Sequence, residues 1–200
     1  MKKLIGWVYL LFSRWTPVGE GLPKKCVIIA APHSTNWDLA NALSVAFDMR
    51  IRFRWVTKDT LFRWWNTWFF RFLGGIPINR RAPQGQVAAV AAKFAECDEL
   101  VLCIAPEGTR SRRDHWKSGF YHIALGAGVP IALGFLDYAK KQGGYGPIIH
   151  PTGDLRRDMD RIREFYAGVT ARFPEKIGPI LLKGEEPAAE PSAAPDADQP

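Results

Sequence analysis

Short apolar runs separated by polar and helical segments dominate the hydrophobic pattern of this chain. Three of these runs are bounded by turn-forming or polar residues, as expected for strands that are buried on both faces. A fourth segment alternates charged and bulky side chains, which is typical of a half-exposed strand. The predicted strands are residues 26–31, 52–57, 76–78, 100–105, 129–136 and 145–150.

Helical segments alternate with these strands along the chain. The clearest spans residues 155–172, where six apolar residues recur at helical spacing. Strands that alternate with helices predict an α/β fold with a mostly parallel sheet flanked by helices. The chain has 200 residues, of which 47% are hydrophobic, enough for a single domain, which we place at residues 23–183. The predicted helices are residues 36–47, 60–72, 84–97, 119–126 and 155–172.

Residues 1–22 predict an N-terminal amphipathic helix. Its apolar part, residues 4–12, is well short of the ~20 residues that span a bilayer, and no small-residue cleavage site follows it. Basic residues lie near both ends of this segment, which also contains Trp7, Tyr9 and Trp15. This composition favours a helix lying in the membrane interface. A helix packed on the core of the domain fits the same pattern, and both interpretations stay open.

Charge is distributed unevenly along the chain. Residues 184–200 hold five of its 20 acidic residues and none of its 27 basic ones, so they predict a disordered acidic tail. The rest of the chain is more basic than the net charge of +7 indicates, which predicts an anionic partner. Aromatic and basic residues interleave over 50–72, which favours contact with anionic lipid headgroups, although some of the rings could instead belong to the core.

The first segment that could carry chemistry is 31–38 (APHSTNWD), directly after a buried strand. If Ser34 or Thr35 caps the next helix, Asp38 falls in the first turn, where a carboxylate is favoured. Asp38 could then accept a hydrogen bond from one ring nitrogen of His33 and leave the other nitrogen basic, as a general base requires. A loop histidine beside an aspartate that only favours the helix start is the plainer interpretation.

A second polar segment, 105–113 (APEGTRSRR), also follows a buried strand. Gly108 would let backbone amides approach a ligand, Thr109 adds a hydroxyl donor, and Arg110 offers a fork that matches phosphate. Glu107 could position Arg110 or bind a substrate hydroxyl. A third segment, 74–81, is a glycine turn that leads to Arg80 and its neighbour Arg81. Each segment alone also fits a solvated polar loop.

Together, the His-x4-Asp segment, the glycine turn ending in arginine, the Pro-Glu-Gly-Thr-Arg-Ser segment and Val129-Pro130 resemble the four ordered blocks of the glycerolipid and lysophospholipid acyltransferase family. Familiar members make phosphatidic acid from lysophosphatidic acid. The resemblance covers roughly residues 26–136, and Lys117-Ser118-Gly119 is similar as well. Pro32, Thr35 and Pro77 depart from the usual residues of the family, which leaves the acceptor open.

The resemblance implies a role for each matching residue. His33 is expected to take the proton of the acceptor hydroxyl, and Asp38 to orient His33. The hydroxyl then attacks a thioester directly, without an acyl-enzyme. The residues expected to bind the substrate, chiefly the phosphate and glycerol of the acceptor, are Arg80, Glu107, Gly108, Thr109, Arg110 and Lys117.

The same resemblance sets the expected partners. The acyl donor is acyl-CoA or acyl-carrier protein, the acceptor is a lysophospholipid, and no cofactor or nucleic acid takes part. No cysteine or histidine spacing indicates a metal site, and the three cysteines are expected to be free thiols. We expect the protein to be peripheral or monotopic at an anionic membrane surface, on the cytoplasmic face. A non-catalytic lipid-binding protein and a nucleic-acid-binding module are the alternative functions.

Overall fold

One sheet organises the protein. The computed structural model describes residues 2–58, 64, 66–78 and 85–185, and within them the sheet has seven strands. They lie in the order β1-β7-β6-β2-β5-β3-β4, and every neighbouring pair is parallel except β6 and β7. The predicted α/β fold with a mostly parallel sheet is therefore confirmed. The strands are β1 (Thr16–Val18), β2 (Lys25–Ala30), β3 (Phe53–Lys58), β4 (Gly75–Ile78), β5 (Leu100–Ile104), β6 (Ile131–Asp137) and β7 (Gln142–Ile149).

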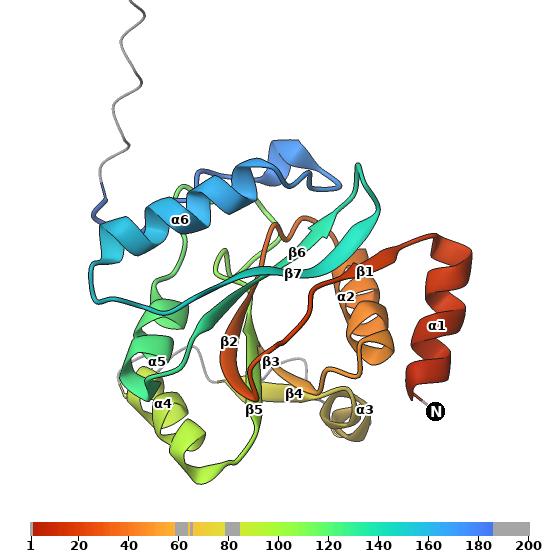
Figure 1. The fold of residues 1–200 in the computed structure, drawn as a ribbon, viewed down its shortest axis with the longest axis horizontal. Coiled ribbons are helices and arrows are strands. Elements are labelled where there is room, and N and C mark those ends of the chain that lie inside the picture. Colours follow the sequence, from red (N-terminus) through yellow and green to blue (C-terminus); the bar gives the residue numbers. More distant parts are fainter. Residues whose placement is uncertain (1, 59–63, 65, 79–84, 186–200) are drawn as a thin grey trace, which may run out of the picture.

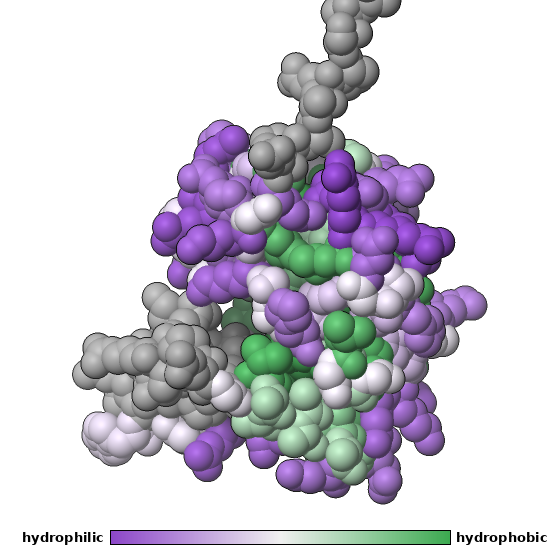
Figure 2. Space-filling view, turned by 90° about the vertical axis from the view of Figure 1, so that its left-hand side faces the viewer, coloured by the Kyte–Doolittle hydropathy of each residue, from purple (hydrophilic) through white to green (hydrophobic). Residues whose placement is uncertain are grey.

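Helices cover both faces of the sheet (Figure 1). Helices α4, α5 and α6 contribute to the larger core on one face, whereas α2 lies on the other face with α1 packed outside it. Figure 2 shows the face formed by α4, α5 and α6, with hydrophilic side chains gathered around α6. The helices are α1 (Lys2–Ser13), α2 (Trp37–Asp48), α3 (Thr67–Phe72), α4 (Gln86–Glu96), α5 (Gly119–Ala127), α6 (Leu155–Ala167) and the 3₁₀ helix η2 (Pro174–Lys176).

Strand β2 lies at the centre of the sheet and is buried from both sides. Val27 and Ile29 point into the core beneath α5 and α6, whereas Cys26 and Ile28 point into the core on the other face. Side chains of a strand alternate between its faces, so a run that is apolar throughout is what a central strand requires. The apolar run predicted at 26–31 therefore marks the middle of the fold.

Helix α1 packs one side against α2 and exposes the other. Gly6 and Leu10 are buried, and a Cβ added at Gly6 would lie 2.7 Å from the carbonyl oxygen of Ser44, so only glycine permits this close approach. The packed side agrees with a helix that lies on the core of the domain, and the membrane-interface interpretation stays a prediction. None of the described helices is both long and apolar enough to cross a bilayer. We call the exposed side the α1 apolar face: Leu4, Ile5, Trp7, Val8, Leu11 and Phe12.

Two features of the sheet differ from the prediction. Strand β1 was not predicted, and β7 begins at Gln142 rather than at residue 145. Gly143 and Gly144 are inside β7, where a Cβ on Gly144 would lie 1.8 Å from the carbonyl oxygen of Val18 in β1. Close approach between two backbones, rather than a turn, explains these glycines.

Helix α6 ends at Ala167, before the predicted residue 172, because Gly168 occupies its C-cap. Helix α3 begins at Thr67, after its N-cap residue Asn66. Residues 60–63 and 65 of the predicted aromatic helix, and 186–200 of the predicted acidic tail, lie outside the described residues.

Candidate active site

The two chemistry-bearing loops leave the sheet at the same edge. Strands β2 and β5 are parallel neighbours, so the loops that follow them emerge side by side. The backbone amide of His33 donates to Oε1 of Glu107 at 3.1 Å, a contact between residues 74 positions apart in the sequence. The Ala31–Pro32 peptide bond just before His33 is cis. The fold therefore brings the first and second sequence segments into direct contact.

His33 and Asp38 form a hydrogen-bonded pair. Nδ1 of His33 lies 3.0 Å from Oδ2 of Asp38, and the same oxygen accepts the backbone amides of Ser34 at 2.8 Å and Thr35 at 2.9 Å. Asn36 is the N-cap residue and makes no side-chain cap, whereas the hydroxyl of Thr35 accepts the amide of Trp37 at 3.4 Å and the carboxylate of Asp38 accepts the loop amides before the helix. The pair thus forms as expected, by a different local arrangement.

The surroundings of Asp38 favour its ionised form. The residue is 4% exposed, and burial alone would raise its pKa. Hydrogen bonds from His33, Tyr138 and the backbone of Thr35 outweigh burial, and the pKa of Asp38 is lowered. A carboxylate at Nδ1 keeps the proton of a neutral imidazole on that nitrogen, so Nε2 of His33 is left as the basic nitrogen. The side chain of His33 is 26% exposed, which leaves it accessible to a substrate.

Glu107 is a buried carboxyl group with one oxygen unpaired. It is 8% exposed, and among the described residues its Oε2 has no hydrogen-bond partner. Burial raises the pKa of Glu107 to about 7, against weaker opposing effects from the amide of His33 and from His33 itself. Near neutral pH this carboxyl group can therefore hold or release a proton, and it offers an oxygen to a ligand.

The glycine turn after Glu107 brings a lysine to the site. Gly108 has a φ of +65°, and a Cβ placed there would lie 3.1 Å from both Cε and Nζ of Lys117. The backbone amide of Lys117 donates to the carbonyl oxygen of Pro106 at 2.9 Å, which closes the loop. Without a side chain at Gly108, the lysine can lie against the turn.

The outer part of the turn is polar and open. The hydroxyl of Thr109 accepts the amide of Ser111 at 3.4 Å, and the exposed guanidinium of Arg110 makes no ion pair with another described residue. Arg110 therefore remains available to an anion. Arg80, the remaining predicted site residue, lies outside the described residues.

A mainly apolar cavity of about 310 Å³ lies behind the two loops. Pro32, the neighbour of His33 in the chain, and Glu107 line it together with residues that follow α6. The volume is at the lower end of the range for sites that hold small ligands. The lining residues are Ala31, Pro32, Glu107, Trp116, Tyr166, Val169, Thr170, Ala171, Pro174, Ile177 and Ile180.

Tyr138 is a site residue that the sequence did not identify. Its hydroxyl donates to Oδ1 of Asp38 at 2.6 Å, although the two residues are 100 positions apart. The only available signal was its position directly after a buried strand, at the edge where the other loops emerge. Within the described ranges, no group of three His, Cys, Asp or Glu side chains is arranged to bind a metal ion.

Comparisons with known proteins place the chain in a family. The family model described as Acyltransferase matches residues 17–132, more than half of the chain. The solved structure of the 1-acyl-sn-glycerophosphate (LPA) acyltransferase PlsC from Thermotoga maritima is similar in fold, with a TM-score of 0.55 and 15% identity over 84% of this chain and 80% of that one. No curated protein matches the chain in sequence. Because the family model spans both loops that meet at His33, the chain belongs to the Acyltransferase family.

Proposed function

We propose that this acyltransferase moves a fatty acyl group from a thioester, acyl-CoA or acyl-carrier protein, to the hydroxyl of a lysophospholipid, with lysophosphatidic acid as the preferred acceptor. The proposal rests on one observation above all, the 3.0 Å contact between His33 and Asp38 beside the buried carboxyl group of Glu107. The similar fold of an LPA acyltransferase supports the choice of acceptor.

The proposed reaction needs one general base. Nε2 of His33 takes the proton of the acceptor hydroxyl as its oxygen attacks the thioester carbonyl carbon. The C–O bond forms, the C–S bond breaks, and the proton passes from His33 to the departing sulfur to give a free thiol. Transfer is proposed to be direct, without an acyl-enzyme; burial raises the pKa of Cys26 and Cys103 to about 12, so neither is an activated thiolate.

The acceptor is proposed to bind through the second loop. Lys117, which lies against Gly108, and Arg110, two positions after it, are exposed cations and suit a phosphate group. The unpaired Oε2 of Glu107 can accept a hydrogen bond from a glycerol hydroxyl. The apolar cavity behind Glu107 can take part of a hydrocarbon chain.

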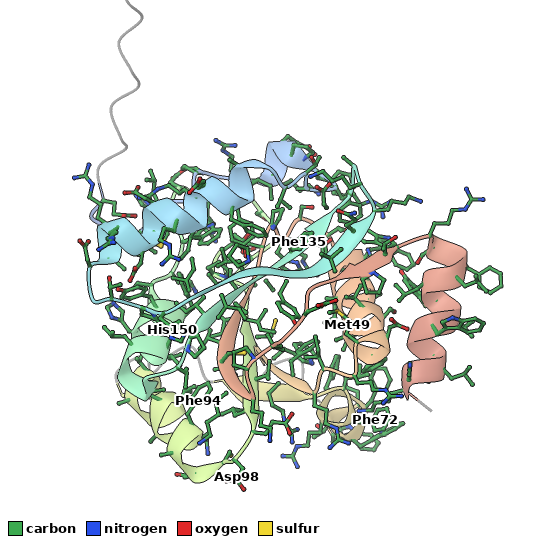
Figure 3. The ribbon with its side chains drawn as sticks, viewed as in Figure 1. Met49, Phe72, Phe94, Asp98, Phe135 and His150 are labelled. Carbon is green, nitrogen blue, oxygen red and sulfur yellow. The ribbon has the colours of Figure 1, made fainter. Side chains whose placement is uncertain are left out.

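An acyl-transfer assay tests this proposal. Purified protein in mixed micelles is incubated with a long-chain acyl thioester and a panel of lysolipids, and the products are identified by mass spectrometry. His33→Ala should lower turnover by a factor of roughly 10² or more. His150→Ala is the matched control, since His150 is exposed after β7 on the α5 side of the molecule (Figure 3). Absence of product with every acceptor and both donor classes would reject the proposal.

We further propose that the α1 apolar face lies on a membrane that contains anionic lipids, with the protein peripheral on its cytoplasmic face. Beside this face, a groove of about 540 Å³ between α1, α2 and α3 is rich in cations and aromatic rings. Nζ of Lys2 lies 4.1 Å from the ring centre of Phe72 at the end of α3 (Figure 3). We call the groove between α1, α2 and α3 the basic groove. Its cations are Lys2, Lys3, Arg50, Arg52 and Arg54.

Aromatic side chains favour the bilayer interface, and each cation near an anionic surface contributes about 1 kcal/mol. Vesicle flotation measures both contributions. Leu11→Asp should abolish flotation with vesicles of phosphatidylcholine and phosphatidylglycerol, whereas Leu125→Asp, an exposed leucine on α5, should not. Vesicles of phosphatidylcholine alone should bind more weakly. Equal flotation of both variants would reject this surface.

A further inference from the structure

A chain of hydrogen bonds connects Asp38 to helix α1. The hydroxyl of Tyr138, just after β6, donates to Oδ1 of Asp38 at 2.6 Å. Nδ2 of Asn41, in α2, donates to the same hydroxyl at 3.0 Å. The hydroxyl of Tyr9, in α1, donates to Oδ1 of Asn41 at 2.9 Å. We call Tyr9, Asn41 and Tyr138 the α1 relay; it joins three elements that are distant in sequence.

The direction of each hydrogen bond in the α1 relay is fixed by its ends. Ionised Asp38 can only accept, so Tyr138 must use its single hydrogen there and accept from Asn41. The amide of Asn41 then faces Tyr138 with its nitrogen, which leaves its oxygen for Tyr9. Asn41 is 3% exposed, so water does not compete strongly for these groups. Each member therefore has one favoured orientation.

The ring of Tyr138 is held by contacts that do not involve its hydroxyl. Trp15, which follows α1, packs edge-on against it with ring centres 4.9 Å apart. The backbone amide of Tyr138 donates to the carbonyl oxygen of Thr170 at 2.9 Å. A phenylalanine at this position would keep both contacts and lose only the hydrogen bonds of the hydroxyl.

We infer that Tyr138 is a positioning residue for the pair of His33 and Asp38, and that Asn41 and Tyr9 hold it, so that α1 must be seated on α2 for the pair to be fully ordered. Oδ2 of Asp38 already accepts His33 and two backbone amides, whereas Tyr138 is the donor described at Oδ1. Without that donor the carboxylate can turn, and the ring of His33 turns with it. The inference rests on the proposed function, because it assigns His33 as the base.

Kinetics of Tyr138→Phe across pH test the inference. We expect kcat to fall roughly tenfold to hundredfold, as for loss of a hydrogen bond to a charged group, with KM within about twofold. The acid limb of the profile should move to higher pH, because the lost hydrogen bond favours the ionised form of Asp38. In the described part of the chain, the charged or titratable groups that face the contact between Tyr138 and Asp38 are His33, Glu107 and Arg172.

A second variant separates coupling from simple loss of stability. Tyr9→Phe should lower kcat less than Tyr138→Phe, by roughly twofold to fivefold, and should cause no further loss when combined with it, since it acts through Tyr138. Tyr121→Phe is the matched control: its hydroxyl donates to Asp158 at 2.8 Å, away from His33. It should lower the melting temperature and leave the pH profile unchanged.

A readout without turnover distinguishes failure of this inference from failure of the proposed function. The ring-nitrogen NMR signals of His33, assigned by their loss in His33→Ala, should change in Tyr138→Phe and not in Tyr121→Phe. If no acyl transfer occurs but these signals change, the coupling holds and the proposed reaction fails. The inference would be overturned if Tyr138→Phe kept the kcat, the pH profile and the His33 ring signals of wild type. If that variant does not fold, the same three results for Tyr9→Phe would overturn it.

Discussion

Glu107→Gln tests whether a buried, partly unpaired carboxyl group makes stability depend on pH. The substitution replaces Glu107 with a neutral amide of similar shape, and the amide oxygen can still accept the backbone amide of His33. In the folded protein burial raises the pKa of Glu107 to about 7, from an ordinary value of 4.5. The unfolded chain loses this proton at the lower pH.

The sign and size of the effect follow from this difference. Between these two values the folded state binds more protons than the unfolded state, so the free energy of unfolding decreases as pH rises. Integrated over that range, the decrease is about 3 kcal/mol, and it is complete above about pH 8. For a chain of this size that corresponds to roughly 6–12 °C in melting temperature.

Denaturant unfolding of wild type and Glu107→Gln at pH 5 to 8 measures the difference directly. Groups other than Glu107 largely cancel when the two curves are subtracted, and a small part of the decrease lies below pH 5, so the variant should gain about 2.5 kcal/mol relative to wild type between pH 5 and pH 8. Glu99→Gln, at an exposed site, should follow wild type throughout. Parallel curves for wild type and Glu107→Gln would refute the reasoning, because they would mean that Glu107 stays ionised over the whole range.

Two further substitutions test the site and the fold. Asp38→Asn should lower kcat by a factor of roughly 10² or more while the protein stays folded, because an amide no longer fixes the Nδ1 proton of His33; activity within threefold of wild type would exclude that role. Gly144→Ala should lower the free energy of unfolding by more than about 2 kcal/mol, since its Cβ would overlap the backbone of Val18. Gly153→Ala, also at positive φ but with open space around it, should lower the free energy of unfolding by less. Equal losses for the two variants would contradict the explanation.

Sequence patterns predict the centre of this fold better than its edges. The central strand β2 is apolar throughout because both of its faces are covered, so the pattern is unambiguous. The edge strand β1 is three residues long and contains Pro17, and its last two residues pair with Gly143 and Gly144 of β7. Neither strand of that pair has the apolar alternation that would reveal it, since the pairing depends on backbone approach rather than on side chains.

In the candidate site, too, the sequence predicts some contacts and not others. His33 and Asp38 are five positions apart, so a local pattern could predict their contact, and parallel strand order could predict that the second loop lies nearby. Tyr138 and Asn41 carry no such pattern, because their contacts join elements far apart in the chain. The raised pKa of Glu107 also depends on the apolar cavity around it, which only the assembled fold creates.

The short connection between α1 and β1 has a consequence for how substrate is reached. Only Arg14 and Trp15 separate the helix from the sheet, and Trp15 is buried, so α1 cannot move independently of the sheet. If α1 rests on a bilayer, the whole sheet is held at one tilt, and His33 at one height above the lipid plane. The distance between His33 and the bilayer would then be fixed, and an acceptor would have to rise out of the bilayer by that distance to react. Such a requirement favours lipids that have only one chain to withdraw.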